Sequence, residues 1–191
     1  AVGPYAQANQ EAAIAVGSNA TAAESNSVAV GQTATAANNN AIAIGTKTVS
    51  RGDNAIGIGA YSESTANRAT AVGVLSQANG EGSFAGGASA HATGTNSVAI
   101  GGATDGTLTN KEGTAAKAKG NNSIALGTNS TATGQNSIAQ GISSVAQQTA
   151  DIAIGANAAA NGTDTPAGSS TAQNAGTAIS IGSNSVATGV A

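Results

Sequence analysis

The chain has 191 residues, of which 8% are charged and 2% aromatic, with no Cys, Met or Trp and a net charge of -3. The absence of Cys excludes a disulfide scaffold and cysteine metal sites, and the mildly acidic balance offers no basic surface for nucleic acid. Such a composition is typical of a disordered linker unless the apolar residues are placed regularly. No apolar run could span a membrane and no signal peptide is present, so we expect the numbering to begin inside a processed or trimmed protein.

The apolar residues are placed regularly, in a repeat that ends in glycine. Residues 26–31 read Asn-Ser-Val-Ala-Val-Gly, residues 96–101 read Asn-Ser-Val-Ala-Ile-Gly, and residues 122–127 read Asn-Ser-Ile-Ala-Leu-Gly. The glycines that end these stretches, here called the coil glycines, recur with a 14-residue period over most of the chain. They are Gly17, Gly31, Gly45, Gly59, Gly73, Gly87, Gly101, Gly127, Gly141, Gly155 and Gly182.

Each repeat predicts two short β-strands. The residues three and one before the coil glycine are usually Ile, Val or Leu, and a small residue lies between them, as in residues 28–30. This period of two is typical of a strand with an aliphatic and a small-residue face. After the coil glycine, small residues recur three and five places on, as at Ala34 and Ala36, which indicates a second strand.

Turn residues separate the two predicted strands. A second set of glycines lies midway between successive coil glycines, and we expect it to supply positive φ. The Asn found two residues later tolerates similar backbone angles. This set is Gly52, Gly80, Gly94, Gly120, Gly134 and Gly162.

Two strands and two turns in each 14-residue repeat predict one coil of a flattened parallel solenoid, and about a dozen coils would form a rod about 55 Å long. We expect the aliphatic pair to fill each coil and the flat Ala/Ser face to pack on other chains. Two buried aliphatic side chains per coil stabilise the fold by less than the conformational entropy that ordering the coil costs. A monomer would therefore be marginal, and we predict a homo-oligomer.

Two intervals between coil glycines exceed the 14-residue period. Gly127 stands 26 positions after Gly101, and Gly182 stands 27 positions after Gly155. They place inserts at about residues 102–115 and 163–175. Loops that project from a rigid solenoid are common recognition sites, although decoration without function is the alternative. Lysines near the first insert could contact an acidic partner, or could form a solvated rim. The candidate ligand-contact residues are Asp105, Lys111, Glu112, Lys117, Lys119 and Asp164.

A few residues depart from the repeat. Phe84 takes the first aliphatic position of its coil and Gly86 the second, which indicates volume compensation by the phenyl ring. Gln140 stands at an aliphatic position, and we expect a satisfied polar core layer there, with an ion or ligand site as the alternative. We expect His91, the only His, to be a surface residue.

No catalytic constellation is found, so we predict no enzymatic activity, no metal and no cofactor.

The hexapeptides at residues 26–31, 96–101 and 122–127, in a 14-residue period, resemble the YadA-like head repeats of trimeric autotransporter adhesins. The resemblance implies one head domain over residues 1–191, folded as a left-handed parallel β-roll and assembled as a homotrimer. It implies an adhesin on the bacterial surface that binds collagen, fibronectin or laminin of the host matrix, cells or abiotic surfaces, and that self-associates. Its anchor in the outer membrane, reached through a coiled-coil stalk and a β-barrel, is absent from this chain.

Two other functions remain open from the residues alone. A left-handed β-helix enzyme of the acyltransferase type uses 18-residue coils, and 14 is not a multiple of its hexapeptide period. An ice-binding solenoid needs a regular array of Thr, whereas Glu63, Gln77 and His91 interrupt the Thr positions of the second strand.

Overall fold

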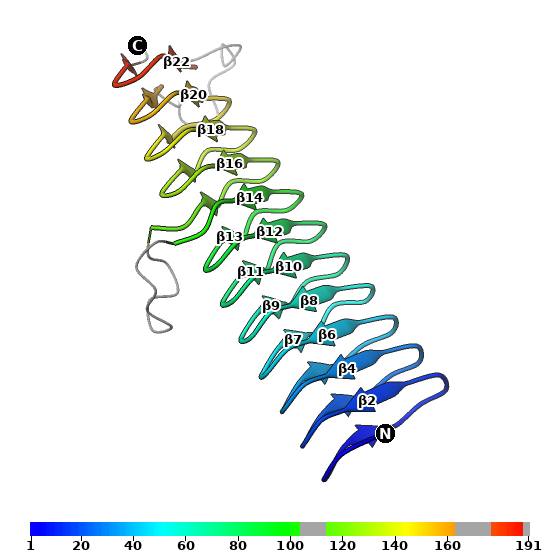
Figure 1. Cartoon of the computed structure of the whole chain (residues 1–191). Helices are drawn as coiled ribbons and strands as arrows, with labels where there is room; N and C mark the ends of the chain where they lie inside the picture. The colour runs from blue at the N-terminus through cyan, green and yellow to red at the C-terminus, as the bar shows by residue number, and fades with distance from the viewer. Residues whose placement is uncertain (104–113, 163–176, 189–191) are drawn as a thin grey trace, which may run out of the picture.

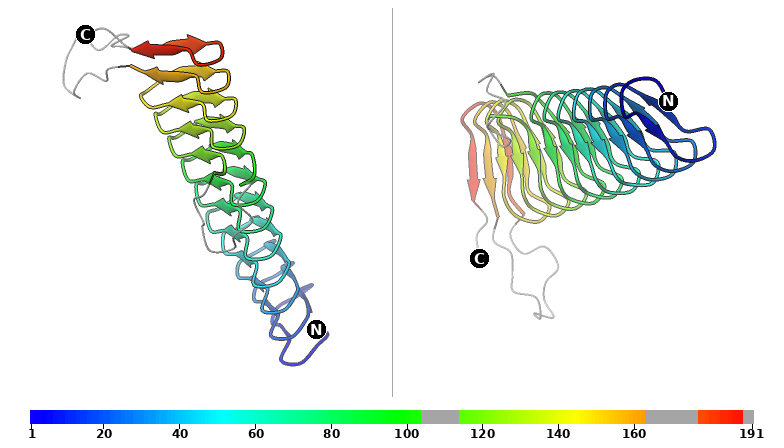
Figure 2. Two further views of the ribbon diagram at one scale, coloured as in Figure 1. Left: turned by 60° about the vertical axis from the view of Figure 1, so that its left-hand side comes forward. Right: turned by 90° about the horizontal axis from the view of Figure 1, so that it is seen from below.

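The computed structural model describes residues 1–103, 114–162 and 177–188. Successive strands alternate between two parallel sheets, one of 12 strands and one of 11. The chain winds as a flattened solenoid with its termini at opposite ends of a rod (Figure 1). Figure 2 shows the two rows of strands as the long walls of each coil. The predicted all-β parallel solenoid of 14-residue coils is confirmed.

The 11-stranded sheet contains the aliphatic strands of the repeat, each three residues long. Its strands are β2 (Ile14–Val16), β4 (Val28–Val30), β6 (Ile42–Ile44), β8 (Ile56–Ile58), β10 (Thr70–Val72), β12 (Phe84–Gly86), β14 (Val98–Ile100), β16 (Ile124–Leu126), β18 (Ile138–Gln140), β20 (Ile152–Ile154) and β22 (Ile179–Ile181).

The 12-stranded sheet contains the second strand of each coil. Its strands are β1 (Gln7–Ala8), β3 (Thr21–Ala22), β5 (Thr35–Ala36), β7 (Val49–Ser50), β9 (Glu63–Ser64), β11 (Gln77–Ala78), β13 (His91–Ala92), β15 (Lys117–Ala118), β17 (Thr131–Ala132), β19 (Val145–Ala146), β21 (Ala159–Asn161) and β23 (Val186–Thr188).

The pairing register follows the repeat across both long intervals. Val28 pairs with Ile42, its counterpart one repeat later in the next coil. Val98 pairs with Ile124, and Ile152 pairs with Ile179, so equivalent positions stay in register where the sequence spacing is longer.

The interior of each coil is built from small side chains, and the expectation that Val and Ile fill it was wrong. Around Gly31, the side chains of Ser27, Ala29, Ala34 and Ala36 are all 0% exposed. These residues stand four and two before the coil glycine and three and five after it. The aliphatic residues on either side of the central Ala point outward instead. The prediction that the Ala/Ser face packs on other chains was wrong for the same reason.

The physical reason is the short distance between the two walls. Even a single methyl group added at Gly57 in β8 would lie 2.8 Å from Ser50 Oγ on the opposite wall. Ala and Ser fill this gap in most coils, and the β-branched Thr48 is fully buried where it faces Gly57, which has no Cβ. Some core hydroxyls bond inside the coil: Ser64 Oγ donates to Ser50 Oγ at 2.9 Å, and Ser50 Oγ donates to the Ile42 carbonyl at 2.6 Å.

The two sets of glycines are required for different reasons. The coil glycine Gly141 has φ +130, and a Cβ there would lie 2.4 Å from the Gly155 carbonyl oxygen. Gly120, in the second set, does not have positive φ, so that expectation was wrong. Its Cβ would instead lie 2.0 Å from the Gly134 carbonyl oxygen of the next coil. Positive φ is found two residues later, at Asn122 (φ 56), as predicted for Asn.

Candidate functional site

The outward face of the 11-stranded sheet, here called the aliphatic face, is the largest candidate interaction surface. Each strand presents its first and third residues, and these are half-buried or exposed in the isolated chain. Eleven strands at about 4.8 Å give a stripe about 50 Å long. Its most exposed large residues are Ile14, Val16, Ile44, Ile58, Val72, Phe84, Ile100, Ile179 and Ile181. Soluble monomers rarely expose a continuous apolar surface of this length, which indicates a packing partner.

Phe84 and Gly86 preserve this face by volume compensation. A Cβ on Gly86 would lie 2.8 Å from Phe84 Cε1, so the phenyl ring occupies the space over the glycine. The predicted compensation is confirmed, although it operates on the aliphatic face and not inside the coil.

Replacing Gly86 with Val should destabilise the protein by about 1–3 kcal/mol, because the new side chain overlaps the Phe84 ring. The double variant F84V/G86V should recover most of this loss, because it recreates the Val-Ala-Val of β4. Thermal unfolding of the single and double variants measures the coupling. Additive effects of the two substitutions would contradict the volume compensation.

Gln140 lies on the aliphatic face, not in the interior of the coil. It is exposed at the end of β18, paired in register with Leu126 and Ile154 on the neighbouring strands. The prediction that Gln140 forms a polar layer in the core of the coil was therefore wrong. A polar layer between chains stays a prediction.

The outward residues of the 12-stranded sheet form a second surface, here called the outer column. Glu63, Gln77, His91 and Lys117 follow one another in register along it. His91 is only 4% exposed, so the expectation of a surface His was wrong. Lys117 is half-buried, and Lys119, just beyond β15, is exposed.

The other predicted contact residues, Asp105, Lys111, Glu112 and Asp164, lie outside the described residues. The described residues that flank the two inserts nevertheless show where each insert leaves the solenoid. Ala116 N donates to the Gly101 carbonyl at 3.0 Å, so the first interval opens and closes at the turn after the aliphatic strand. The second begins after β21, at the opposite turn. The two inserts thus leave the solenoid from opposite edges.

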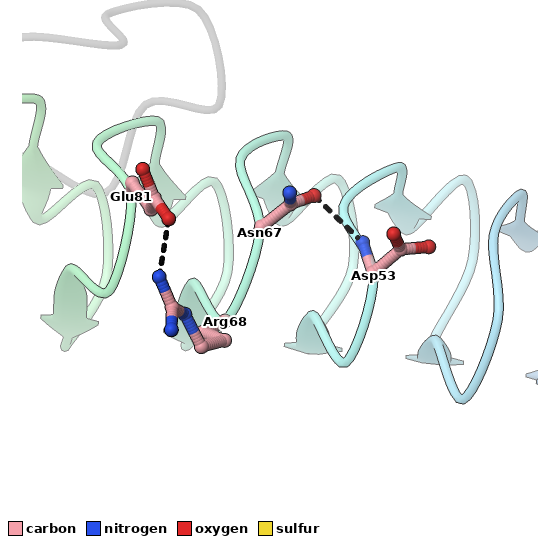
Figure 3. A network of polar contacts seen from close by, with 4 residues as sticks. All are labelled: Asp53, Asn67, Arg68 and Glu81. Carbon is pink, nitrogen blue, oxygen red and sulfur yellow. Dashed lines mark hydrogen bonds and ion pairs between the residues drawn. The ribbon is translucent and has the colours of Figure 1, made fainter.

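The turns at that opposite edge carry a polar network between neighbouring coils (Figure 3). Arg68 pairs with Glu81, and the side chains of both are more than half exposed. Asn67 Oδ1 accepts the backbone N–H of Asp53 at 3.0 Å. Exposed ion pairs contribute at most about 1 kcal/mol, so this network is a solvated rim and not a binding site by itself.

The acids do not gather into a reactive site. Within residues 1–103, 114–162 and 177–188, no group of three or more His, Cys, Asp or Glu could hold a metal ion. No helix in those ranges has the length and apolar character to cross a membrane. Asp151 alone is placed unusually, because its side chain is fully buried. Sequence reasoning missed it, although it stands four residues before Gly155, where the other coils have Ser or Ala.

A protein-family model described as YadA head domain repeat (2 copies) matches most of the chain. The matched segments are residues 1–20, 22–48, 50–76, 64–90, 78–104, 113–130 and 132–158. Neighbouring matches such as 50–76 and 64–90 are offset by one 14-residue coil, in agreement with the strand register. A comparison with curated proteins gives no significant match.

Proposed function

The chain belongs to the YadA head family, the non-enzymatic heads of trimeric bacterial surface adhesins, and we propose that it acts as a homotrimeric adhesin head. Its partners would be collagen, fibronectin or laminin of the host matrix, host cells, abiotic surfaces and further copies of itself. The left-handed winding implied by the family resemblance is part of this proposal. An acyltransferase role has no support in a non-enzymatic family.

The aliphatic face is the observation that supports the trimer. Burying one Ile or Val is worth about 1.5–3 kcal/mol, and this face offers such residues in nearly every coil. Because the stripe repeats in register from coil to coil, three parallel copies can bring equivalent residues together along one axis. In such a trimer the three Gln140 side chains would meet at one level and could hydrogen-bond to one another.

The surfaces left outside the trimer are available for ligands. They are the outer column, the two turn edges and the bases of the two inserts. We propose that the candidate residues Asp105, Lys111, Glu112, Lys117, Lys119 and Asp164 contribute to recognition. Presenting one weak site three times raises the apparent affinity by avidity, so binding should depend on the trimer.

A binding panel of collagen, fibronectin and laminin tests the proposal, with trimeric protein whose mass in solution has been measured. We expect at least one of them to bind, and binding to weaken at higher salt if the lysines contact an acidic partner. Deleting residues 163–175 while the trimer is retained should reduce binding if the second insert contacts the ligand. A trimer that binds no matrix protein, cell or surface and does not self-associate would contradict the adhesin function.

A further inference from the structure

The C-terminal part of the chain, residues 120–191, contains only two charged side chains, Asp151 and Asp164. Asp151 is 0% exposed, inside a core made mostly of Ala and Ser. An ionised carboxylate in such a place is costly unless hydrogen bonds compensate its lost hydration. The other coils avoid this cost by using Ser or Ala at the same position.

The Asp151 carboxylate accepts hydrogen bonds from three backbone N–H groups. Oδ1 accepts from Ala178 at 2.8 Å and from Gly162 at 3.2 Å. Oδ2 accepts from Gly162 at 3.0 Å and from Gln148 at 2.9 Å. Two of these donors belong to the coil that carries the second insert: Gly162 precedes the insert at residues 163–175, and Ala178 follows it.

A regular coil needs no such acceptor. In the coil of Gly141, the N–H of Ser137 donates to the Gly134 carbonyl at 3.3 Å and closes the turn. The Ser137 hydroxyl donates to the same carbonyl at 2.7 Å. Ala178 is the counterpart of Ser137 in the coil that carries the second insert, and its N–H bonds to the carboxylate of Asp151 in the preceding coil. Asp151 thus supplies an acceptor where the long interval interrupts the regular turn.

We propose that Asp151 is the positioning residue of the second insert. Its carboxylate joins the two ends of the interrupted turn and keeps β22 in register with β20. The coil stack can then carry an insert at this edge without unsatisfied buried N–H groups, each of which would cost stability. This role is independent of any ligand and does not rest on the adhesin function.

The test is a double-mutant cycle between Asp151→Ser and deletion of residues 163–175, which restores a 14-residue coil. In the full chain, D151S should lower Tm by about 5 °C or more. It should also speed amide hydrogen exchange at Gly162 and Ala178 by about tenfold or more. In the deletion variant, D151S should be neutral or stabilising, because the backbone carbonyls of a regular turn accept the hydrogen bonds that the carboxylate no longer accepts. A purely local packing role predicts equal effects in both backgrounds, and that result would overturn the proposal.

Two further variants test the proposed role of the carboxylate independently of D151S. Ser137→Asp places a carboxylate in a coil whose turn is already closed, so it should be strongly destabilising; a neutral S137D would contradict the proposed role. Asp151→Asn retains one acceptor oxygen, and it should give an intermediate loss of exchange protection at Gly162 and Ala178 if D151S does not fold. Unchanged protection in D151N would also overturn the proposal. All readouts are made without ligand, so they are separable from any failure of matrix binding.

Discussion

Replacing Gly141 with Ala should destabilise the protein by at least about 4 kcal/mol, which is exceptional for the addition of one methyl group. Positive φ alone costs an L-residue about 1–3 kcal/mol in this sparsely populated region, and Gly141 has φ +130. The clash between stacked coils should cost more than this. The new Cβ would lie 2.4 Å from the Gly155 carbonyl oxygen, which belongs to the backbone and cannot rotate away. The neighbouring coils would have to separate, and their hydrogen bonds would be lost.

Gly182 offers a matched control for this substitution. It has nearly the same backbone angle, φ +124, but among the described residues its Cβ would meet only Ser185 Cβ at 3.9 Å. Gly182→Ala should therefore cost only the conformational penalty of positive φ, about 1–3 kcal/mol. Chemical or thermal unfolding of both variants measures the difference. Equal losses would show that the contact between stacked coils is not the reason for glycine.

The double variant I44D/I58D should abolish the trimer. Ile44 and Ile58 pair in register on β6 and β8, and both are exposed on the aliphatic face of the single chain. Both are 39% exposed, so if three chains bury this exposed part of six side chains, the variant loses roughly 4–7 kcal/mol of apolar burial per trimer. It also brings six carboxylates together in the interface, which adds a desolvation cost. Light scattering coupled to size-exclusion chromatography should show loss of the trimer mass.

The matched control places the same substitutions on the opposite wall of the solenoid. Thr35 and Val49 point outward on neighbouring strands of the 12-stranded sheet, on the outer column. T35D/V49D should keep the trimer, because the proposed interface lies on the aliphatic face. Trimers of normal mass from I44D/I58D, or dissociation of T35D/V49D alone, would place the interface elsewhere.

Much of the fold follows from the sequence because the repeat is strict. The coil glycines mark one turn, and Asn122 and its counterparts mark the other. Between the turns, the period of two permits only strands. When the coils have equal length, parallel pairing one repeat apart is the simplest register, and even the exchange of volume between Phe84 and Gly86 can be predicted from their spacing.

Less of the candidate site could be predicted from the sequence. Alternation separates an aliphatic face from a small-residue face, but it does not say which face points inward. Hydrophobicity favoured the wrong answer for the strands of the 11-stranded sheet, and it put Gln140 in the core. Asp151 is the one acid at a position where every other coil has Ser or Ala, so the sequence marks it as an exception. Its role becomes evident only from the structure, which shows the backbone N–H groups that bond to its carboxylate.

The sequence by itself thus determined the coil length, the two strands, the turns and the family, because these depend on local backbone preferences repeated in one period. Only the tertiary structure decided which side chains are inside. The two walls lie so close that Ala and Ser fill most of the interior, and the β-branched Thr48 is buried where it faces Gly57, which has no Cβ. The aliphatic side chains are therefore outside, where they form the surface on which the proposed assembly depends.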